Sequence, residues 1–240
     1  MNIAVILAGG SGYRIGESTP KQFLKVCGKT LLEYCIDVFE HHAKIDRIVI
    51  VVREDYIKEV QSLIDRNNYK KTHSVLPGGK ERYESSMSAL SSCESDDDVL
   101  LFHDCARPLV SHRIISDCIQ SMEHYDAVTV ATNTTDTIYI SNDSGEISSI
   151  PPRSTLLNAQ TPQCFRAHTI RSAYKHAQQD PSFQPTDDCS VVFRYLPEVL
   201  IQIVAGDPTN IKITYKEDLE TMRRILEARN KGKNDRNVLK

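Results

Sequence analysis

Glycines and two basic residues gather near the start of the chain, in the segment LAGGSGYRIGESTPKQF that begins at Leu7. Three glycines within four residues remove the side chains that would hold the backbone away from an anion, so consecutive N–H groups can converge on a phosphate. The segment directly follows an apolar run, and open α/β sheets bind ligands at the carboxyl ends of their strands. The residues expected to hold a phosphate-rich ligand are Leu7, Ala8, Gly9, Gly10 and Gly12, with Arg14 and Lys21 as fixed positive charges.

Two better-known phosphate motifs do not fit this spacing. A P-loop needs the pattern G-x-x-x-x-G-K-[ST], and a dinucleotide fingerprint needs a glycine where Ile15 stands. A plain strand-to-helix turn is the structural alternative, but such a turn has little use for two basic residues at these offsets. We therefore interpret the loop as an anion-binding site outside both motif classes.

A second glycine-rich segment, GGKERYES, begins at Gly78 between a predicted strand and a predicted helix. Amides at a helix N-terminus can bind a nucleobase edge or a phosphate. Helix capping is the alternative, because Gly-Gly pairs are common in loops.

A carboxylate, Asp104, follows the hydrophobic run VLLF and His103. It is thereby placed at the carboxyl end of a strand, on the ligand side of the sheet. A carboxylate that faces phosphates needs a cation between them, so we expect Asp104 to bind Mg²⁺ and to place the substrate. An N-cap or an ion pair with Arg107 is the alternative. His103 is interpreted as a buried structural group.

The elements that must position these residues follow from hydrophobic periodicity. Apolar runs typical of buried strands occur at Asn2–Leu7, Arg47–Val52, Val99–Phe102, Ala127–Ala131 and Val199–Val204. Helical spacing occurs at Leu31–His41, Asp55–Asn67, Glu81–Ser91, His112–His124, His168–Gln178 and Lys216–Asn230. This alternation predicts an α/β fold with a Rossmann-like, doubly wound and mostly parallel sheet. One domain over residues 1–230 accommodates all these elements.

Two segments depart from the alternation. Residues 136–163 contain short strand-like stretches, a turn at Asn142–Gly145 and the pair Pro151-Pro152, which predict a projecting β-arm. Such an arm has few partners within one subunit, so we expect it to dock on a second copy in a homodimer. The charged, aperiodic segment 231–240 is expected to be disordered. Asp187 and Asp188 precede an apolar run and are interpreted chiefly as a helix cap.

Composition excludes several classes of protein. The chain is 40% hydrophobic and 25% charged with a formal charge of -3, which argues against a nucleic-acid partner. Seven cysteines without any C-x-x-C pair suggest neither a zinc site nor a disulfide framework, and free thiols suit a cytoplasmic protein. No apolar run reaches membrane-spanning length, and Met1 leads directly into the first predicted strand, so we expect neither secretion nor membrane insertion.

Taken together in chain order, the motifs resemble a known family. The patterns AGGxGxR, PKQ, GGxER, HDxARP, TPQ and NIKxT are similar to those of cytidylyltransferases that act on 2-C-methyl-D-erythritol 4-phosphate or on ribitol 5-phosphate. The matches extend from Ala8 to about Leu219. The resemblance implies a Rossmann-like fold, a homodimer with a protruding arm, and Mg²⁺-dependent release of pyrophosphate from CTP.

The resemblance also implies roles for individual residues. It places Gly79 and Lys80 near the cytosine. Nucleotide binding is further implied for Ser85 and Ala106, and substrate binding for Asp104, Arg107, Asp136, Thr137, Arg153, Thr161 and Lys212. Thr137 and Arg153 would bind the acceptor's phosphate across the dimer interface, since a guanidinium can hold two phosphate oxygens at once. Arg14, Lys21, Arg153 and Lys212 are the residues expected to carry catalysis. Read without the family, Lys212 would be a solvated lysine.

The implied reaction is attack by a phosphate oxygen of a polyol phosphate on the α-phosphorus of CTP. The nucleophile is already an anion, so the reaction calls for cations and amides rather than a general base. Gln160 and the stretch from Asp188 to Val192 resemble the ribitol-phosphate (capsule or teichoic-acid type) members, whereas Thr186-Asp187-Asp188 is similar to the methylerythritol members of isoprenoid biosynthesis. We favour a pentitol phosphate, with 2-C-methyl-D-erythritol 4-phosphate as the alternative acceptor. A non-catalytic nucleotide-binding paralogue and a reductase, or a partner of one, are the alternatives from other classes.

Overall fold

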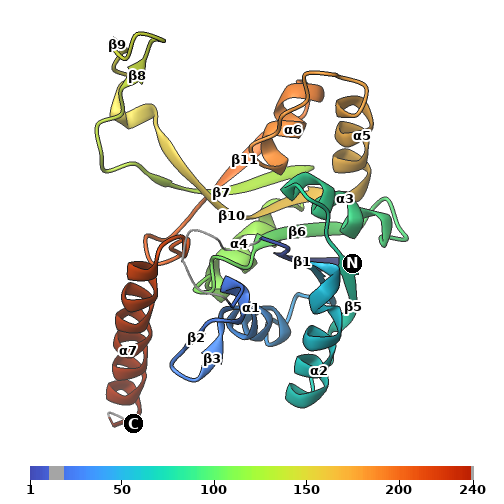
Figure 1. Cartoon of the computed structure of the whole chain (residues 1–240), viewed down its shortest axis with the longest axis vertical. Helices are drawn as coiled ribbons and strands as arrows, with labels where there is room; N and C mark the ends of the chain where they lie inside the picture. The colour runs from blue at the N-terminus through green and yellow to red at the C-terminus, as the bar shows by residue number, and fades with distance from the viewer. Residues whose placement is uncertain (11–18, 239–240) are drawn as a thin grey trace.

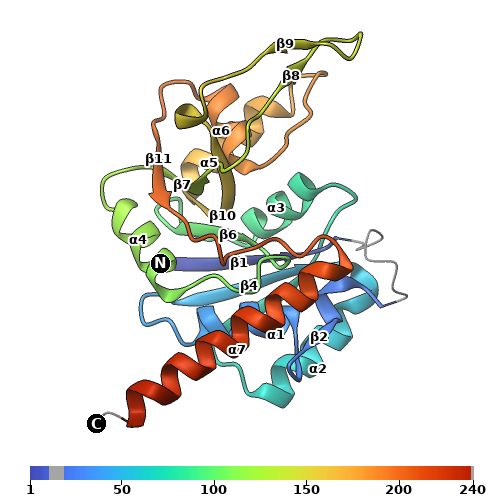
Figure 2. The same ribbon diagram turned by 90° about the vertical axis from the view of Figure 1, so that its left-hand side faces the viewer.

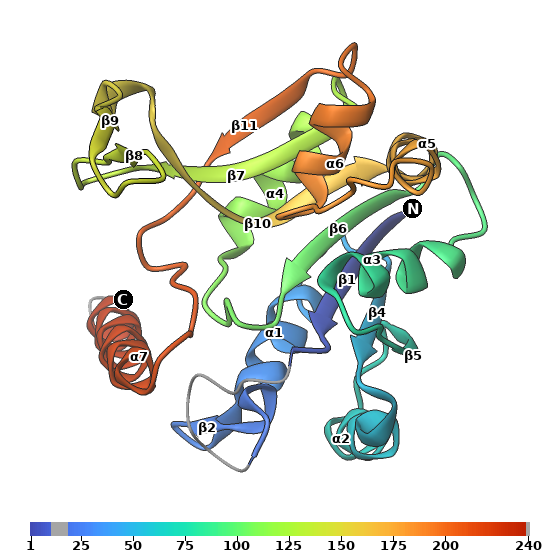
Figure 3. The same cartoon turned by 45° about the horizontal axis from the view of Figure 1, so that its top comes forward.

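The computed structural model describes residues 1–10 and 19–238, and of residues 232–238 only the backbone. A seven-stranded sheet with the order β11-β7-β10-β6-β1-β4-β5 crosses the centre of the molecule (Figures 1 and 3). Neighbouring strands are parallel except where β10 runs antiparallel to β6 and β7. This confirms the predicted doubly wound, mostly parallel sheet. The strands are β1 (Asn2–Ala8), β4 (Arg47–Val52), β5 (Thr72–Pro77), β6 (Val99–Asp104), β7 (Ala127–Asn133), β10 (Leu157–Arg166) and β11 (Ile201–Ala205).

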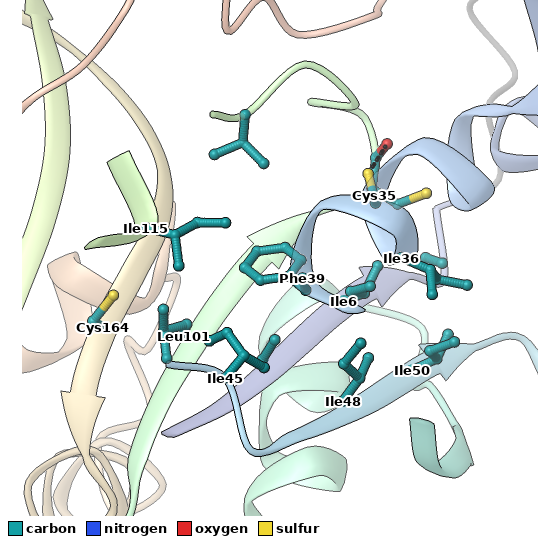
Figure 4. Packing of buried hydrophobic residues seen from close by; sticks show 14 of the residues in the cluster. Ile6, Cys35, Ile36, Phe39, Ile45, Ile48, Ile50, Leu101, Ile115 and Cys164 are labelled. Atoms are coloured by element: carbon teal, nitrogen blue, oxygen red, sulfur yellow. Dashed lines mark hydrogen bonds between the residues drawn. The ribbon is translucent and has the colours of Figure 1, made fainter. Parts of the chain in front are cut away.

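Helices cover both faces of the sheet, which explains why the central strands are apolar throughout rather than alternating. In β1, Ala4 and Ile6 belong to the core on one face, and Val5 and Leu7 belong to the core on the other. Figure 4 shows Ile6 in the first of these cores, near Phe39 of α1. The first face is covered by α1 (Leu31–Glu40), α2 (Ile57–Asn67) and α4 (His112–Ser121), and the second by α3 (Arg82–Ser91), α5 (Ala167–Ala177) and α6 (Asp188–Tyr195).

Local capping fixes where two of these helices begin. Thr30 and Glu33 form a reciprocal capping box at α1. Asp187 is the N-cap of α6, where its side chain accepts a hydrogen bond from the Ser190 amide, so the predicted cap at this position is confirmed. Because a cap satisfies amides that have no partner inside the helix, the first turn of α6 is held in register beside the sheet.

The last helix, α7 (Lys216–Val238), passes in front of α1 and β2 in the view of Figure 2. Its apolar residues Leu219 and Met222 pack with Val26, Leu31 and Ile213 in a small separate core. The helix extends to Val238, beyond the predicted end at Asn230, and the disorder expected for residues 231–240 stays a prediction.

The projecting arm is shorter than predicted. It leaves β7, carries the small hairpin of β8 (Ile140–Ser141) and β9 (Ile147–Ser149), and returns through the 3₁₀ turn η4 (Arg153–Thr155) (Figure 1). Residues 157–163 instead belong to β10, in the middle of the sheet. The polar segment QTPQ does not look like a central strand in the sequence. It can lie in the middle of the sheet because its polar side chains form buried hydrogen bonds.

Short elements complete the fold: β2 (Lys25–Val26), β3 (Lys29–Thr30), and the 3₁₀ turns η2 (Lys21–Phe23) and η3 (Glu54–Tyr56). All seven cysteines are free thiols. Among the described residues, no helix has the length and apolar character needed to cross a bilayer.

Candidate active site

A pocket of about 260 Å³ lies at the carboxyl ends of β1 and β6. The two strand ends are neighbours, since Leu7 pairs with Asp104 and the Cys105 amide donates to the Leu7 carbonyl oxygen. Parallel strands thus bring the glycine-rich loop and the carboxylate to one place, as the sequence predicts. The predicted residues that line the pocket are Leu7, Ala8, Gly9, Gly10, Lys21, Gly79, Lys80, Ser85, Asp104, Ala106 and Lys212. Gly12 and Arg14 lie outside the described residues.

Glycine is required where the second loop enters α3. A Cβ atom on Gly79 would lie 2.2 Å from Cβ of Glu84. Glu84 is held there because its carboxylate accepts a hydrogen bond from the Glu81 amide in the capping box of α3. The backbone of Gly79 can therefore pack closely against the first turn of α3, and it carries no side chain that would separate a ligand from the pocket wall.

Lys21 belongs to the 3₁₀ turn η2, which follows Pro20. Its side chain lies over the first loop, since a Cβ atom on Gly10 would be 3.9 Å from Cε of Lys21. Lys21, Lys80, Arg82 and Lys212 line the pocket together with the carboxylates of Glu81 and Asp104. Within the described part of the chain, cationic side chains on the pocket wall outnumber carboxylates, which suits a polyanionic ligand.

Two cations hold Asp104. Its Oδ1 is 3.2 Å from Nε of Arg82, and its Oδ2 is 3.0 Å from Nζ of Lys212. Burial raises the pKa of Asp104, but the charges of Arg82 and Lys212 outweigh that effect and hold the pKa well below its ordinary value. Asp104 is therefore an anion at neutral pH.

Sequence reasoning gave no role to four residues that line the pocket, Gln22, Glu81, Arg82 and Cys105, and of these Arg82 forms an ion pair with Asp104. Arg82 is the first residue of α3, lines the pocket, and also pairs with the buried Asp188 at 2.5 Å. The sequence carries its signal only as the arginine of the GGxER pattern. Its partner lies 106 positions away in the chain, and no local spacing indicates such a contact.

Thr161 and Arg107 are not among the residues that line the pocket, and the substrate-binding roles that the resemblance implies for them stay predictions. Thr161 is buried, and its hydroxyl bonds Nδ1 of His103 at 3.0 Å and accepts the Asp104 amide at 3.1 Å. Arg107 donates to the carbonyl oxygens of Asn210 and Ala159. Both residues thus support the pocket from outside its wall, because their polar groups are used to connect β6, β10 and the segment before Lys212.

The arm residues Asp136, Thr137 and Arg153 are exposed and do not line the pocket of their own chain. Arg153 donates to the carbonyl oxygen of Thr135 at 3.2 Å. Arg153 therefore does not reach the pocket of its own subunit, and its predicted contact with an acceptor stays a prediction.

Gln160 likewise serves the interior. Its side chain bonds the backbone of Asp207 in both directions and accepts from Asn210. Gln160 is not among the residues that line the pocket.

The chemistry of Mg²⁺ can be compared with the donors present. Mg²⁺ usually keeps several waters and binds one or two carboxylates together with substrate phosphates. Residues 1–10 and 19–238 contain no converging group of three or more His, Cys, Asp or Glu. The ionised Asp104 on the pocket wall therefore fits a Mg²⁺ ion that is held by one carboxylate, by substrate phosphates and by water.

His103 is confirmed as a buried structural group. It is fully buried, its Nε2 lies 2.9 Å from the carbonyl oxygen of Arg107, and burial lowers its pKa to about 4. The unfolded chain has a histidine pKa of about 6.5. Between these values the unfolded state binds a proton that the folded state does not, so stability falls as pH falls through this window.

We therefore expect the free energy of unfolding to drop by about 2–3 kcal/mol from this group between pH 7 and 4.5. Urea unfolding at the two pH values measures it. His103→Gln should show a smaller drop than the wild type, whereas the exposed control His73→Gln should keep the full drop. Equal drops in the wild type and His103→Gln would contradict the assignment.

Comparison with known proteins agrees with this geometry. The family model for 2-C-methyl-D-erythritol 4-phosphate cytidylyltransferase (IspD) matches residues 2–228. A 2-C-methyl-D-erythritol 4-phosphate cytidylyltransferase of Thermobifida fusca is 41% identical over 229 residues, covering 93% of this chain and 92% of that protein. The bifunctional ribulose 5-phosphate reductase/CDP-ribitol pyrophosphorylase Bcs1 of Haemophilus influenzae is 39% identical over 95% of this chain, which spans 48% of that protein.

A solved structure shows the same fold. The 4-diphosphocytidyl-2C-methyl-D-erythritol synthase of Anaerococcus prevotii superposes with a TM-score of 0.83 at 28% identity, over 94% of this chain and 98% of that one. Residues 2–228, which the family model matches, include the seven strands of the sheet, α1 to α6 and every residue that lines the pocket.

Proposed function

The chain belongs to the 2-C-methyl-D-erythritol 4-phosphate cytidylyltransferase (IspD) family, and from this premise we propose that it transfers CMP from CTP to a pentitol phosphate, with ribitol 5-phosphate as the first choice. Members of this family are nucleotidyltransferases. The observation that carries the proposal is the single pocket in which Gly9, Gly10, Lys21 and Lys212 meet the carboxylate of Asp104. The ribitol-type sequence features and the Haemophilus relative support the choice of acceptor.

In the proposed reaction, an acceptor phosphate oxygen forms a bond to the α-phosphorus of CTP as the bond to the bridging oxygen breaks and pyrophosphate leaves. The amides of the first loop and Lys21 stabilise the charge that builds on the α-phosphate, with Arg14 of the same loop assigned this role from sequence. Lys212 holds the acceptor's phosphate next to the α-phosphate of CTP. When bound by Asp104 and the nucleotide phosphates, Mg²⁺ supplies further charge neutralisation.

Pyrophosphate release with a panel of acceptors tests the function. The purified chain, CTP and Mg²⁺ are incubated with ribitol 5-phosphate, with 2-C-methyl-D-erythritol 4-phosphate, or with no acceptor. We expect kcat/KM to be highest for ribitol 5-phosphate. A higher value for 2-C-methyl-D-erythritol 4-phosphate would assign the acceptor named by the Thermobifida relative, and CTP binding without release for any acceptor would favour a non-catalytic paralogue.

The arm supports a homodimer in which Arg153 reaches the pocket of the other copy. Ile138, Tyr139, Ile140, Ile147 and Ile150 are exposed on the arm, and exposed apolar groups of this kind mark interaction surfaces. The Haemophilus relative is named as a bifunctional reductase and pyrophosphorylase, and for this chain we propose a reductase in the cytoplasm as the functional partner that supplies the acceptor.

Mixing two inactive variants tests the shared site. Lys21→Ala and Arg153→Ala are each expected to be nearly inactive, but a mixed dimer contains one pocket with both residues intact. Activity should therefore reappear when the two variants are unfolded and refolded together. Activity that stays at the level of the separate variants would show that Arg153 does not act across subunits.

A further inference from the structure

A chain of charged and polar groups leads from the interior to the pocket through three helices. Tyr174 of α5 donates its hydroxyl to Oδ1 of Asp188 at 2.6 Å, and Arg82 of α3 donates to Oδ2 of the same carboxylate at 2.5 Å. Arg82 then reaches Asp104 with Nε. The side chain of Asp188, the first residue of α6, is fully buried. These contacts connect the face of the sheet covered by α3, α5 and α6 to the ligand-binding edge.

The network gives the two cations beside Asp104 unequal freedom. Arg82 is bound to carboxylates on two sides, and its side chain is 29% exposed. Lys212 approaches from a segment outside the sheet, and its side chain is 46% exposed. A guanidinium can serve two carboxylates at once because its donors form a rigid fork, whereas an ammonium on a flexible stem can exchange partners.

Burial explains why the anchor holds. Removing a charge from water is costly unless it is paired, so Asp188 keeps Arg82 in place as its counter-ion. The charges of Asp188 and Asp104 outweigh the burial that lowers the pKa of Arg82, and the pKa rises above its ordinary value. Burial and the neighbouring Asp188 raise the pKa of the Tyr174 hydroxyl, which remains a donor.

We propose that Arg82, locked by Asp188, is a positioning residue that fixes Asp104 through Oδ1 and leaves Lys212 as the exchangeable partner that transfers to a substrate phosphate. The inference rests on the proposed function. It states that, when substrate binds in that pocket, the contact between Arg82 and Asp104 is kept and the contact between Lys212 and Asp104 is lost. Asp188 and Tyr174 act on the reaction only through Arg82.

The chain contains a matched control. Asp180 also accepts from an arginine and a tyrosine, Arg194 and Tyr195, each at 2.7 Å, but it lies away from the pocket. Asp180→Asn therefore removes a similar carboxylate from a similar pair of donors without touching Arg82. It is expected to leave kcat and KM at the wild-type values.

The test is a double-mutant cycle on kcat/KM, measured by pyrophosphate release. Asp188→Asn is expected to lower kcat/KM about 30-fold in the wild type, but less than about threefold in an Asp104→Asn background, because its effect passes through Asp104. The KM for the acceptor should rise more than the KM for CTP, since a loosened Asp104 competes for Lys212. A general loss of folded enzyme would instead lower kcat and leave both KM values unchanged.

Equal losses in the two backgrounds, or Asp188→Asn behaving like Asp180→Asn, would overturn the positioning role. If Asp188→Asn fails to fold, Tyr174→Phe replaces it in the same cycle, with an expected loss of about threefold to fivefold in the wild type only. A wild-type protein that releases no pyrophosphate with any acceptor would refute the proposed function, which is a separate result.

Discussion

Lys21→Ala is expected to lower turnover about a thousandfold while the protein remains folded. Lys21 lies over the glycine loop that is predicted to hold the triphosphate, so its ammonium can meet the charge that develops on the α-phosphate. Interactions that strengthen in the transition state lower kcat when they are lost, rather than only raising KM. The sequence predicts a loss of the same size for Arg14→Ala.

Steady-state kinetics at saturating CTP and acceptor measures the loss, and circular dichroism checks the fold. Lys25→Ala is the control, because Lys25 is an exposed lysine close by in β2. It should retain wild-type kcat. Near-normal turnover in Lys21→Ala would remove the residue from the catalytic set.

Asp104→Asn should produce the second large effect, a loss of about a hundredfold to a thousandfold in kcat/KM. The substitution keeps the size of the side chain but removes the negative charge that Arg82 and Lys212 share. Lys212 then has no fixed anion to orient it before substrate arrives, and the pocket loses the carboxylate suited to Mg²⁺. Arg82 keeps Asp188, so we expect the fold to survive.

Initial rates over a range of Mg²⁺ concentrations provide the measurement. Asp117→Asn, which removes the exposed partner of Arg113 on α4, is the control and should behave as the wild type. If Asp104→Asn retained more than about half of the wild-type kcat/KM at every Mg²⁺ concentration, Asp104 would have neither of the roles assigned to it.

Much of the fold could be predicted because the central strands are buried on both faces. β1, β4, β6 and β7 are therefore mostly apolar, and this pattern is visible without knowing which strands pair. Residues 157–163 of β10 fall within the segment predicted as an arm, and Gln160, Thr161 and Gln163 interrupt the apolar pattern there. Each is buried in the sheet and bonds a group that is distant in sequence, such as His103 or Asp187. Hydrogen bonds to groups so distant in the chain cannot be predicted from hydrophobic periodicity, which reports only local spacing.

Most of the candidate site could also be predicted, for a topological reason. The loops after β1 and β6 must meet because their strands are parallel neighbours, so Gly9, Gly10 and Asp104 were expected together. Lys212 was predicted through the motif alone. Thr161 and Arg107 belong to equally recognisable motifs, yet their side chains turn inward to His103 and to the Asn210 carbonyl oxygen. A motif gives a residue's place along the chain, and packing decides which way its side chain points.

The sequence by itself predicted the fold class, five of the seven strands of the sheet, the anion-binding loop and the class of chemistry, because strand-like runs and local motif spacing are sufficient for each of them. Only the tertiary structure decided that Arg82 bridges Asp104 and the buried Asp188. That bridge joins α3 to α6 across more than a hundred residues of chain. It depends on how two helices pack on one face of the sheet, and on the high cost of burying a carboxylate without a counter-ion.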